Sequence, residues 1–200
     1  MSREEELALN LSEVRSQIPP KVTLIVVTKT FPLSDVEILY KLGEREFGEN
    51  RDEEGREKSE LMPEDAIWHF QGRVQSKKLR SLVGWSDFIH SLEDLKHAKK
   101  INEISQSLGK IQRVFLQINL DENERGEGRS GIAAEDMPAY VSEIQSLQSI
   151  EIVGLMGIAP LNRDPRPGFE KLARLSEKLQ QMAPSATSIS AGMSADYKQA

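Results

Sequence analysis

The chain of 200 residues carries 26 Lys and Arg against 32 Asp and Glu, a net charge of −6, and contains no cysteine. The lack of cysteine excludes disulfides, zinc sites built on thiolates and a cysteine nucleophile. The acidic balance disfavours binding to a phosphate backbone, and no apolar run approaches the length of a membrane span. We therefore expect a cytoplasmic globular protein that binds neither nucleic acid nor membrane.

The first predicted helix begins after Ser2, which opens a capping box, and is followed by the apolar run 22–27. Such a run is typical of a strand that is buried on both faces of a parallel sheet. Ser34 predicts a second capping box, and Gly43 predicts the end of the helix that follows it. The sequence thus begins as helix, strand and helix.

Short strands and longer helices then alternate. Further strands are predicted at residues 45–47, 67–71, 87–90, 113–119, 150–156 and 187–190. Helices with one apolar face include residues 92–108, 135–147 and 169–182, and a charged, glycine-rich loop is predicted at 121–131. This alternation predicts an α/β fold with a parallel sheet, either open and doubly wound or closed into a (β/α)8 TIM barrel.

The turn after the first strand lacks the glycines that mark a nucleotide site in an open sheet, and this favours the barrel. Seven βα units can be counted, so the eighth unit of a barrel is missing from this chain. No shift in composition marks a second domain. We therefore expect residues 1–200 to form a single barrel domain.

In such a barrel, functional residues lie at the C-terminal ends of the strands. Lys29 follows the first strand, where apolar walls would desolvate its amine and make it a nucleophile; alternatively, it extends into solvent. Asn50 follows the second strand and either lines the mouth or caps the next helix. His69 faces the interior from the third strand, as a core histidine or a functional one. With only three histidines, no metal site is expected.

The turn after the seventh strand contains Ser190, Gly192, Met193 and Ser194. A small turn that enters a helix presents free N–H groups and the positive end of the helix dipole to an anion. Barrels often bind phosphate after strands seven and eight, which makes this turn a candidate phosphate site. The alternative is an ordinary turn in which Ser194 caps a helix.

Several short motifs occur in order along most of the chain, among them Val27-Thr28-Lys29-Thr30, Phe47-Gly48-Glu49-Asn50, Trp68-His69-Phe70-Gln71-Gly72, Gly154-Leu155-Met156 and Ser190-Ala191-Gly192-Met193-Ser194. Together they resemble the pyridoxal phosphate homeostasis protein family, which are single-domain barrels similar to the N-terminal domain of alanine racemase. The resemblance implies that pyridoxal 5′-phosphate is held covalently on a lysine as an aldimine. It implies these cofactor-binding residues: Lys29, Asn50, His69, Met156, Ser190, Gly192, Met193 and Ser194.

The resemblance also implies a monomeric protein that serves intracellular homeostasis of pyridoxal phosphate without a dedicated catalytic reaction. Apo-enzymes that use the cofactor are candidate recipients. The family continues with an Arg-(Ile/Leu)-Gly-Thr segment on an eighth strand, which this sequence does not contain. We therefore expect weak or absent cofactor binding by this chain.

Two other functions stay open. The first is a racemase-like enzyme, which needs an acid–base group on each face of the cofactor. In racemases one of these groups comes from a second domain, which 200 residues do not provide, although weak racemase-like activity is not excluded. The second is an enzyme acting on phosphorylated sugars, with Lys29 on the sugar carbonyl and a carboxylate base at a strand end. Asp87 begins a predicted strand instead of ending one, which gives that function little support.

Overall fold

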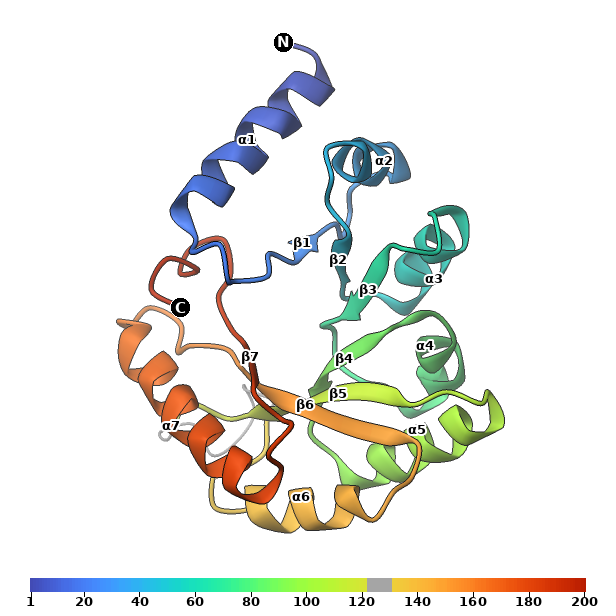
Figure 1. The fold of residues 1–200 in the computed structure, drawn as a ribbon, viewed down its shortest axis with the longest axis vertical. Coiled ribbons are helices and arrows are strands. Elements are labelled where there is room, and N and C mark those ends of the chain that lie inside the picture. The colour runs from blue at the N-terminus through green and yellow to red at the C-terminus, as the bar shows by residue number, and fades with distance from the viewer. Residues whose placement is uncertain (122–130) are drawn as a thin grey trace.

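The computed structural model describes residues 1–121 and 131–200, and in it seven parallel strands form one curved sheet. The strands follow one another in sequence order from β1 to β7, and helices cover the outer side of the curve (Figure 1). This is the arrangement that alternating strands and helices predict, because each right-handed crossover places the next strand beside the previous one. The predicted fold class is confirmed, with seven parallel strands, of which β1 to β6 are each followed by a helix.

The strands are β1 Val26–Val27, β2 Glu46–Glu49, β3 Ile67–Phe70, β4 Phe88–Leu92, β5 Gln112–Ile118, β6 Ile150–Gly157 and β7 Ser188–Ser190. The helices are α1 Arg3–Gln17, α2 Leu33–Lys41, α3 Asp52–Leu61, α4 Leu79–Trp85, α5 Leu95–Ser107, α6 Met137–Gln145 and α7 Arg166–Met182. A single 3-10 turn, Ser76–Lys78, precedes α4. Among the described helices, none combines the length and the apolar character that crossing a membrane requires.

The first strand is shorter than the apolar run 22–27 predicts. β1 pairs with β2 through Val26↔Phe47 and Val27↔Gly48, and these are its only partners among the described strands. Val27 is 40% exposed, so the expectation of a strand buried on both faces is wrong here. The physical reason is that β1 lies at one end of the sheet, where a second neighbour is lacking to pair with the rest of the run.

Of the three helix ends predicted from capping residues, at Ser2, Gly43 and Ser34, the structure confirms the first two. Ser2 and Glu5 form the predicted capping box at the start of α1. Gly43 has φ of +101° just after α2, as a glycine at a helix C-terminus commonly does. The capping box expected at Ser34 is wrong, because Pro32 takes the N-cap position of α2, two residues earlier, and no side chain caps the helix.

Two clusters of buried apolar side chains stabilise the fold. The larger one lies between β4, β5 and β6 and the helices α4 to α7 that cover them. The smaller one lies between β2, β3 and α2, and contains Phe47 and Trp68. Trp68 and Phe70 belong to the clusters packed against the helices, so the alternation of the strand turns His69 toward the interior, as predicted. Most of the predicted loop 121–131 lies outside the described residues.

Candidate functional site

Lys29 lies on the turn that follows β1, and its side chain is exposed. Within the described part of the chain, its amine makes no hydrogen bond or ion pair. The expectation that apolar walls desolvate this amine is therefore wrong in this structure. The cause is the position of β1 at the end of the sheet, where only β2 shields the strand.

The residue before Lys29 is fixed by a buried ion pair. Thr28 Oγ1 donates a hydrogen bond to Glu49 Oε1 at 2.6 Å. Lys58 Nζ donates to the Thr28 carbonyl oxygen at 2.7 Å and to Glu49 Oε1 at 2.5 Å. Glu49 ends β2 and Lys58 lies on α3, and both side chains are buried. The turn that carries Lys29 is thus held from beneath by two elements of the barrel wall.

The residue after Lys29 is fixed as well. Thr30 has φ of 68°, a left-handed conformation that a β-branched residue rarely adopts. Its backbone N–H donates to Glu54 Oε2 at 2.8 Å. This hydrogen bond is the main cause that lowers the pKa of Glu54, and Arg51 adds to it. Lys29 therefore presents a free amine between two backbone positions that the structure holds in place.

Asn50 is half-buried directly after β2, and its Oδ1 atom is buried without a hydrogen-bond partner among the described residues. The alternative of a helix cap is wrong, because Arg51 takes the N-cap position of α3. The neighbouring strand ends approach closely, since a Cβ on Gly72 would lie 2.1 Å from the Asn50 carbonyl oxygen. The side-chain oxygen Oδ1 of Asn50, buried and without a described partner, is suited to accept a hydrogen bond from a ligand.

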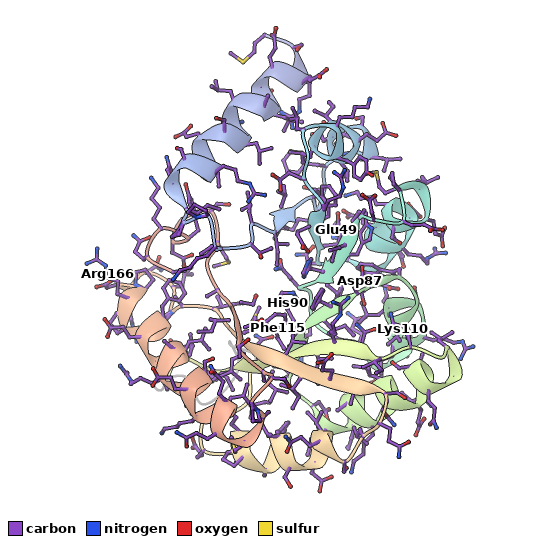
Figure 2. The ribbon with its side chains drawn as sticks, in the orientation of Figure 1. Glu49, Asp87, His90, Lys110, Phe115 and Arg166 are labelled. Carbon is purple, nitrogen blue, oxygen red and sulfur yellow. The ribbon has the colours of Figure 1, made fainter. Side chains whose placement is uncertain are left out.

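His69 is buried and belongs to a continuous chain of hydrogen bonds. Its Nε2 lies 2.6 Å from Glu46 Oε2, and its Nδ1 lies 2.8 Å from Nε2 of His90. His90 Nδ1 in turn lies 2.7 Å from Ser190 Oγ. The chain therefore links β2, β3, β4 and β7 across the concave side of the sheet. In Figure 2, His90 and Phe115 lie at the centre of the curved sheet.

Aromatic rings enclose the two histidines. His69 stacks on Phe88 with 4.8 Å between the ring centroids, and His90 stacks on Phe115 at 4.3 Å. Burial lowers the pKa of His90 well below its ordinary value, and His69 adds to the effect. His90 is therefore neutral at neutral pH. Sequence reasoning missed His90 and Glu46, although alternation from Phe88 places His90 on the inner face of β4.

Ser190 ends β7 beside Met156, the Cα partner to which it is paired on β6. Met156 is buried and Ser190 is half-buried, so both lie where the inner surface of the sheet reaches its C-terminal edge. The sheet thus brings Met156, Ser190 and, through His90, His69 together.

The turn after β7 has the backbone of an anion-binding turn, but the described residues 191–200 contain no helix. Gly192 has φ of +90°, and a Cβ there would come within 2.9 Å of Tyr197. The Met193 N–H donates to Asp196 Oδ1 at 2.6 Å. Residues 194–199 form turns, so the expectation of a helix dipole and of Ser194 as its cap is wrong. The Asp196 contact nevertheless demonstrates that a backbone amide of this turn can bind an anionic oxygen.

Not all predicted residues are brought together. Asn50 and His69 lie on the neighbouring strands β2 and β3, next to β1, which leads to Lys29. Gly192, Met193 and Ser194 follow β7, which is at the other end of the sheet from β1 (Figure 1). Among the described strands, β1 and β7 are not paired with each other. Lys29 and the β7 turn therefore flank the two ends of the sheet.

Comparison with known proteins gives a consistent result. The family model of the alanine racemase N-terminal domain matches residues 3–200. A pyridoxal phosphate homeostasis protein of Synechocystis sp. is 38% identical over 197 residues, which cover 94% of this chain and 88% of that protein. The protein of the same name from Schizosaccharomyces pombe is 30% identical and covers 94% of this chain, and the match spans 82% of that protein.

Solved structures agree with the sequence relatives. PipY of Synechococcus elongatus with pyridoxal phosphate bound has 33% sequence identity and a TM-score of 0.86, with 96% of this chain and 92% of that chain covered. Alanine racemase of Clostridium difficile has 17% identity and a TM-score of 0.80, and the match covers 96% of this chain and 50% of the enzyme. The likeness to the racemase is one of fold alone. The chain belongs to the family of pyridoxal phosphate homeostasis proteins, with a barrel of the alanine racemase N-terminal type.

Proposed function

We propose that this protein holds pyridoxal 5′-phosphate covalently on Lys29 and serves homeostasis of the cofactor without a dedicated catalytic reaction. The observation that carries the proposal is the free amine of Lys29 on a turn whose two flanking residues, Thr28 and Thr30, are fixed by carboxylates. Such an amine is available to a carbonyl group, and its backbone loses little freedom on reacting. Relatives named for pyridoxal phosphate homeostasis support the choice of ligand.

The remaining residues fit the chemical groups of this cofactor. Asn50 Oδ1 is an acceptor that is buried without a described partner, and His69 and Met156 present a ring and an apolar surface. The turn with Gly192, Met193 and Ser194 would receive the phosphate, and there it would compete with Asp196 for the Met193 amide. When bound, the cofactor supplies a reactive aldehyde and an electron-accepting ring. Holding the aldehyde on Lys29 keeps its free concentration low.

Competing functions receive less support from the described residues. An enzyme acting on phosphorylated sugars needs a carboxylate base near Lys29, but Glu49 is committed to the buried pair with Lys58. A racemase needs a base on each face of the cofactor, whereas the sequence relatives are named for homeostasis of pyridoxal phosphate. We further propose that residues 1–200 form one domain, that the protein is a cytoplasmic monomer, and that apo-enzymes receive the cofactor from it.

The test is a spectroscopic titration with pyridoxal phosphate, carried to saturation. A band that depends on Lys29, together with a mass increase on the Lys29 peptide after borohydride reduction, is the expected result. Lys29→Ala should lose both signals, whereas Lys21→Ala, which removes another exposed lysine, should keep them. Labelling spread equally over the surface lysines would refute the proposal, and rapid α-proton exchange of an amino acid would favour the racemase-like enzyme.

A further inference from the structure

With both histidines neutral, the hydrogen-bond chain from Glu46 to Ser190 can have only one direction. A carboxylate only accepts, so His69 donates its Nε2–H to Glu46. Neutral His69 then accepts at Nδ1, so His90 carries its hydrogen on Nε2. His90 in turn accepts at Nδ1, and the donor is the Ser190 hydroxyl. In this state the only hydrogen of Ser190 Oγ is committed to His90, and the oxygen can only accept hydrogen bonds from the site.

One added proton reverses the two hydrogen bonds that join His69, His90 and Ser190, while His69 still donates to Glu46. A proton that enters at Ser190 Oγ displaces the hydroxyl hydrogen to His90 Nδ1, and the hydrogen on His90 Nε2 moves to His69 Nδ1. His69 is then an imidazolium with both ring nitrogens protonated, and Glu46 faces the new charge at 2.6 Å. His90 is neutral before and after, as its burial requires. Ser190 now accepts from His90 and keeps one hydrogen that it can donate to a ligand.

The charged groups around the histidines place the proton on His69. Those on the packed strands or directly next to them are Arg45 before β2, Glu46 and Glu49 on β2, Asp87 before β4, Glu93 after β4, Arg113 on β5 and Glu151 on β6, while β3 and β7 carry none besides His69 itself. Of these, Glu49 is paired with Lys58 on α3. Arg113 lies over the Phe88 ring at 4.0 Å, and Asp87 accepts the backbone N–H of Trp68. Glu46 is the carboxylate that contacts a histidine of the chain, so charge settles beside it.

We propose that Glu46, His69 and His90 form a proton relay that sets whether Ser190 accepts or donates a hydrogen bond, and that proton uptake turns Ser190 into a donor for a phosphate oxygen. The consequence for phosphate rests on the proposed function, because it requires the phosphate of the cofactor to lie at the β7 turn. The relay itself does not. In this relay Glu46, His69 and His90 are positioning residues that act through Ser190, and they make retention of a phosphorylated ligand depend on pH.

The relay can be tested without any ligand, by nitrogen NMR of the histidine rings. The protein has three histidines. The third, His97, is hydrogen-bonded to Ser76, and its NMR signals can be identified by their loss in His97→Gln. Between about pH 8 and about pH 5, we expect His69 to become charged while His90 stays neutral and moves its hydrogen from Nε2 to Nδ1. A His90 ring that keeps the Nε2–H form throughout, or that itself becomes charged, would overturn the relay.

Glu46→Gln is the matched variant, because the amide oxygen can still accept from His69 but carries no charge. It removes the charge that favours a proton on His69, so the protonation change at His69 and the hydrogen shift at His90 should move together to lower pH. The control is Arg113→Gln, which removes a charge that contacts Phe88. In this variant His69 should still become charged while His90 stays neutral and moves its hydrogen. If the two midpoints separate in the Glu46 variant, the histidines titrate independently and the relay is refuted.

The link to phosphate is measured by comparing pyridoxal phosphate with pyridoxal, which has the aldehyde but no phosphate. Pyridoxal partly closes into an internal hemiacetal, so the phosphate contact is isolated by the change in the ratio of the two dissociation constants between a variant and the original chain. Near pH 6, Glu46→Gln and Ser190→Ala should each reduce the advantage of the phosphate by about tenfold, and near pH 8 by much less. An unchanged ratio in both variants would refute the link to phosphate. No Lys29-dependent binding of either compound would refute the proposed function, while the NMR result would still decide the relay.

Discussion

Lys58 is a buried lysine whose amine lies between the Thr28 carbonyl oxygen and the Glu49 carboxylate. The Glu49 side chain is fully buried, so its charge depends on this single cation and on the Thr28 hydroxyl. Its second oxygen, Oε2, has no hydrogen-bond partner among the described residues. Removing the lysine therefore leaves an uncompensated charge in the wall of the barrel, directly beneath the turn of Lys29.

We predict that Lys58→Met lowers the free energy of unfolding by about 3–5 kcal/mol, because it leaves Glu49 buried and unpaired. Urea denaturation measures the loss. Lys41→Met, which removes an exposed lysine from α2, should change the stability by less than about 0.5 kcal/mol. The double variant Lys58→Met with Glu49→Met should recover part of the loss, since no buried charge remains. Equal, small effects of the two lysine substitutions would contradict this account of the pair.

β5, β6 and β7 follow the sequence more closely than β1 does. The predicted ranges 113–119, 150–156 and 187–190 lie at Gln112–Ile118, Ile150–Gly157 and Ser188–Ser190. β1 retains two residues of a run of six, since it has one partner. An apolar run indicates which side chains a segment can bury. The length of the strand also depends on whether neighbouring strands are present to pair with it, and the local sequence does not show this.

The packing of α3 on α4 gives a prediction at this scale. Gly55 lies within α3, and a Cβ there would come within 2.4 Å of the Trp85 ring, whose Nε1–H donates to Asp52. Gly84 lies within α4 and has open space around it. Helix propensity alone favours alanine at both positions. Packing should reverse that preference at Gly55, because the indole is held by a hydrogen bond and cannot move away freely.

Gly84→Ala should therefore raise the free energy of unfolding by about 0.5–1 kcal/mol, and Gly55→Ala should lower it by about 1–3 kcal/mol. Chemical denaturation of the two variants beside the original chain is the measurement. If both substitutions stabilise the protein, the indole adapts to the new methyl group, and the contact between α3 and Trp85 is looser than the structure indicates.

At the scale of the whole molecule, single residues of the site could be predicted from the sequence, but the hydrogen bonds that connect them could not. His69 and Ser190 were found from motifs, but their connection runs through His90, 100 residues from Ser190 in the chain. The exposure of Lys29 likewise depends on what lies beside β1, and no local pattern contains that. Long-range pairing across a curved sheet decides both properties, so they become visible only when the strands are placed side by side.

The two ends of the sheet also differ in how much core supports them. α1 has no buried residue and β1 has two residues, and the nearby cluster at Phe47 and Trp68 is the smaller of the two. β5 and β6 run through the larger cluster. Segments with few buried apolar contacts open at lower free energy than the core. We therefore predict that native-state hydrogen exchange is faster in α1, β1 and α2 than in β5 and β6.

Binding of pyridoxal phosphate should slow hydrogen exchange more around Lys29 than in β5 and β6. Because Lys29 belongs to the less stable end, opening of residues 22–42 requires release of the ligand, whereas many openings elsewhere do not. At a free ligand concentration of about 100 times Kd, the free energy of that opening should rise by about 2.7 kcal/mol. Hydrogen exchange with mass-spectrometric readout measures the change, and Lys29→Ala should abolish it without altering exchange in the free protein. Protection that rises only at β5 and β6 would place the ligand away from Lys29, whereas a joint rise after β1 and at the β7 turn would mean that one bound molecule spans both ends of the sheet.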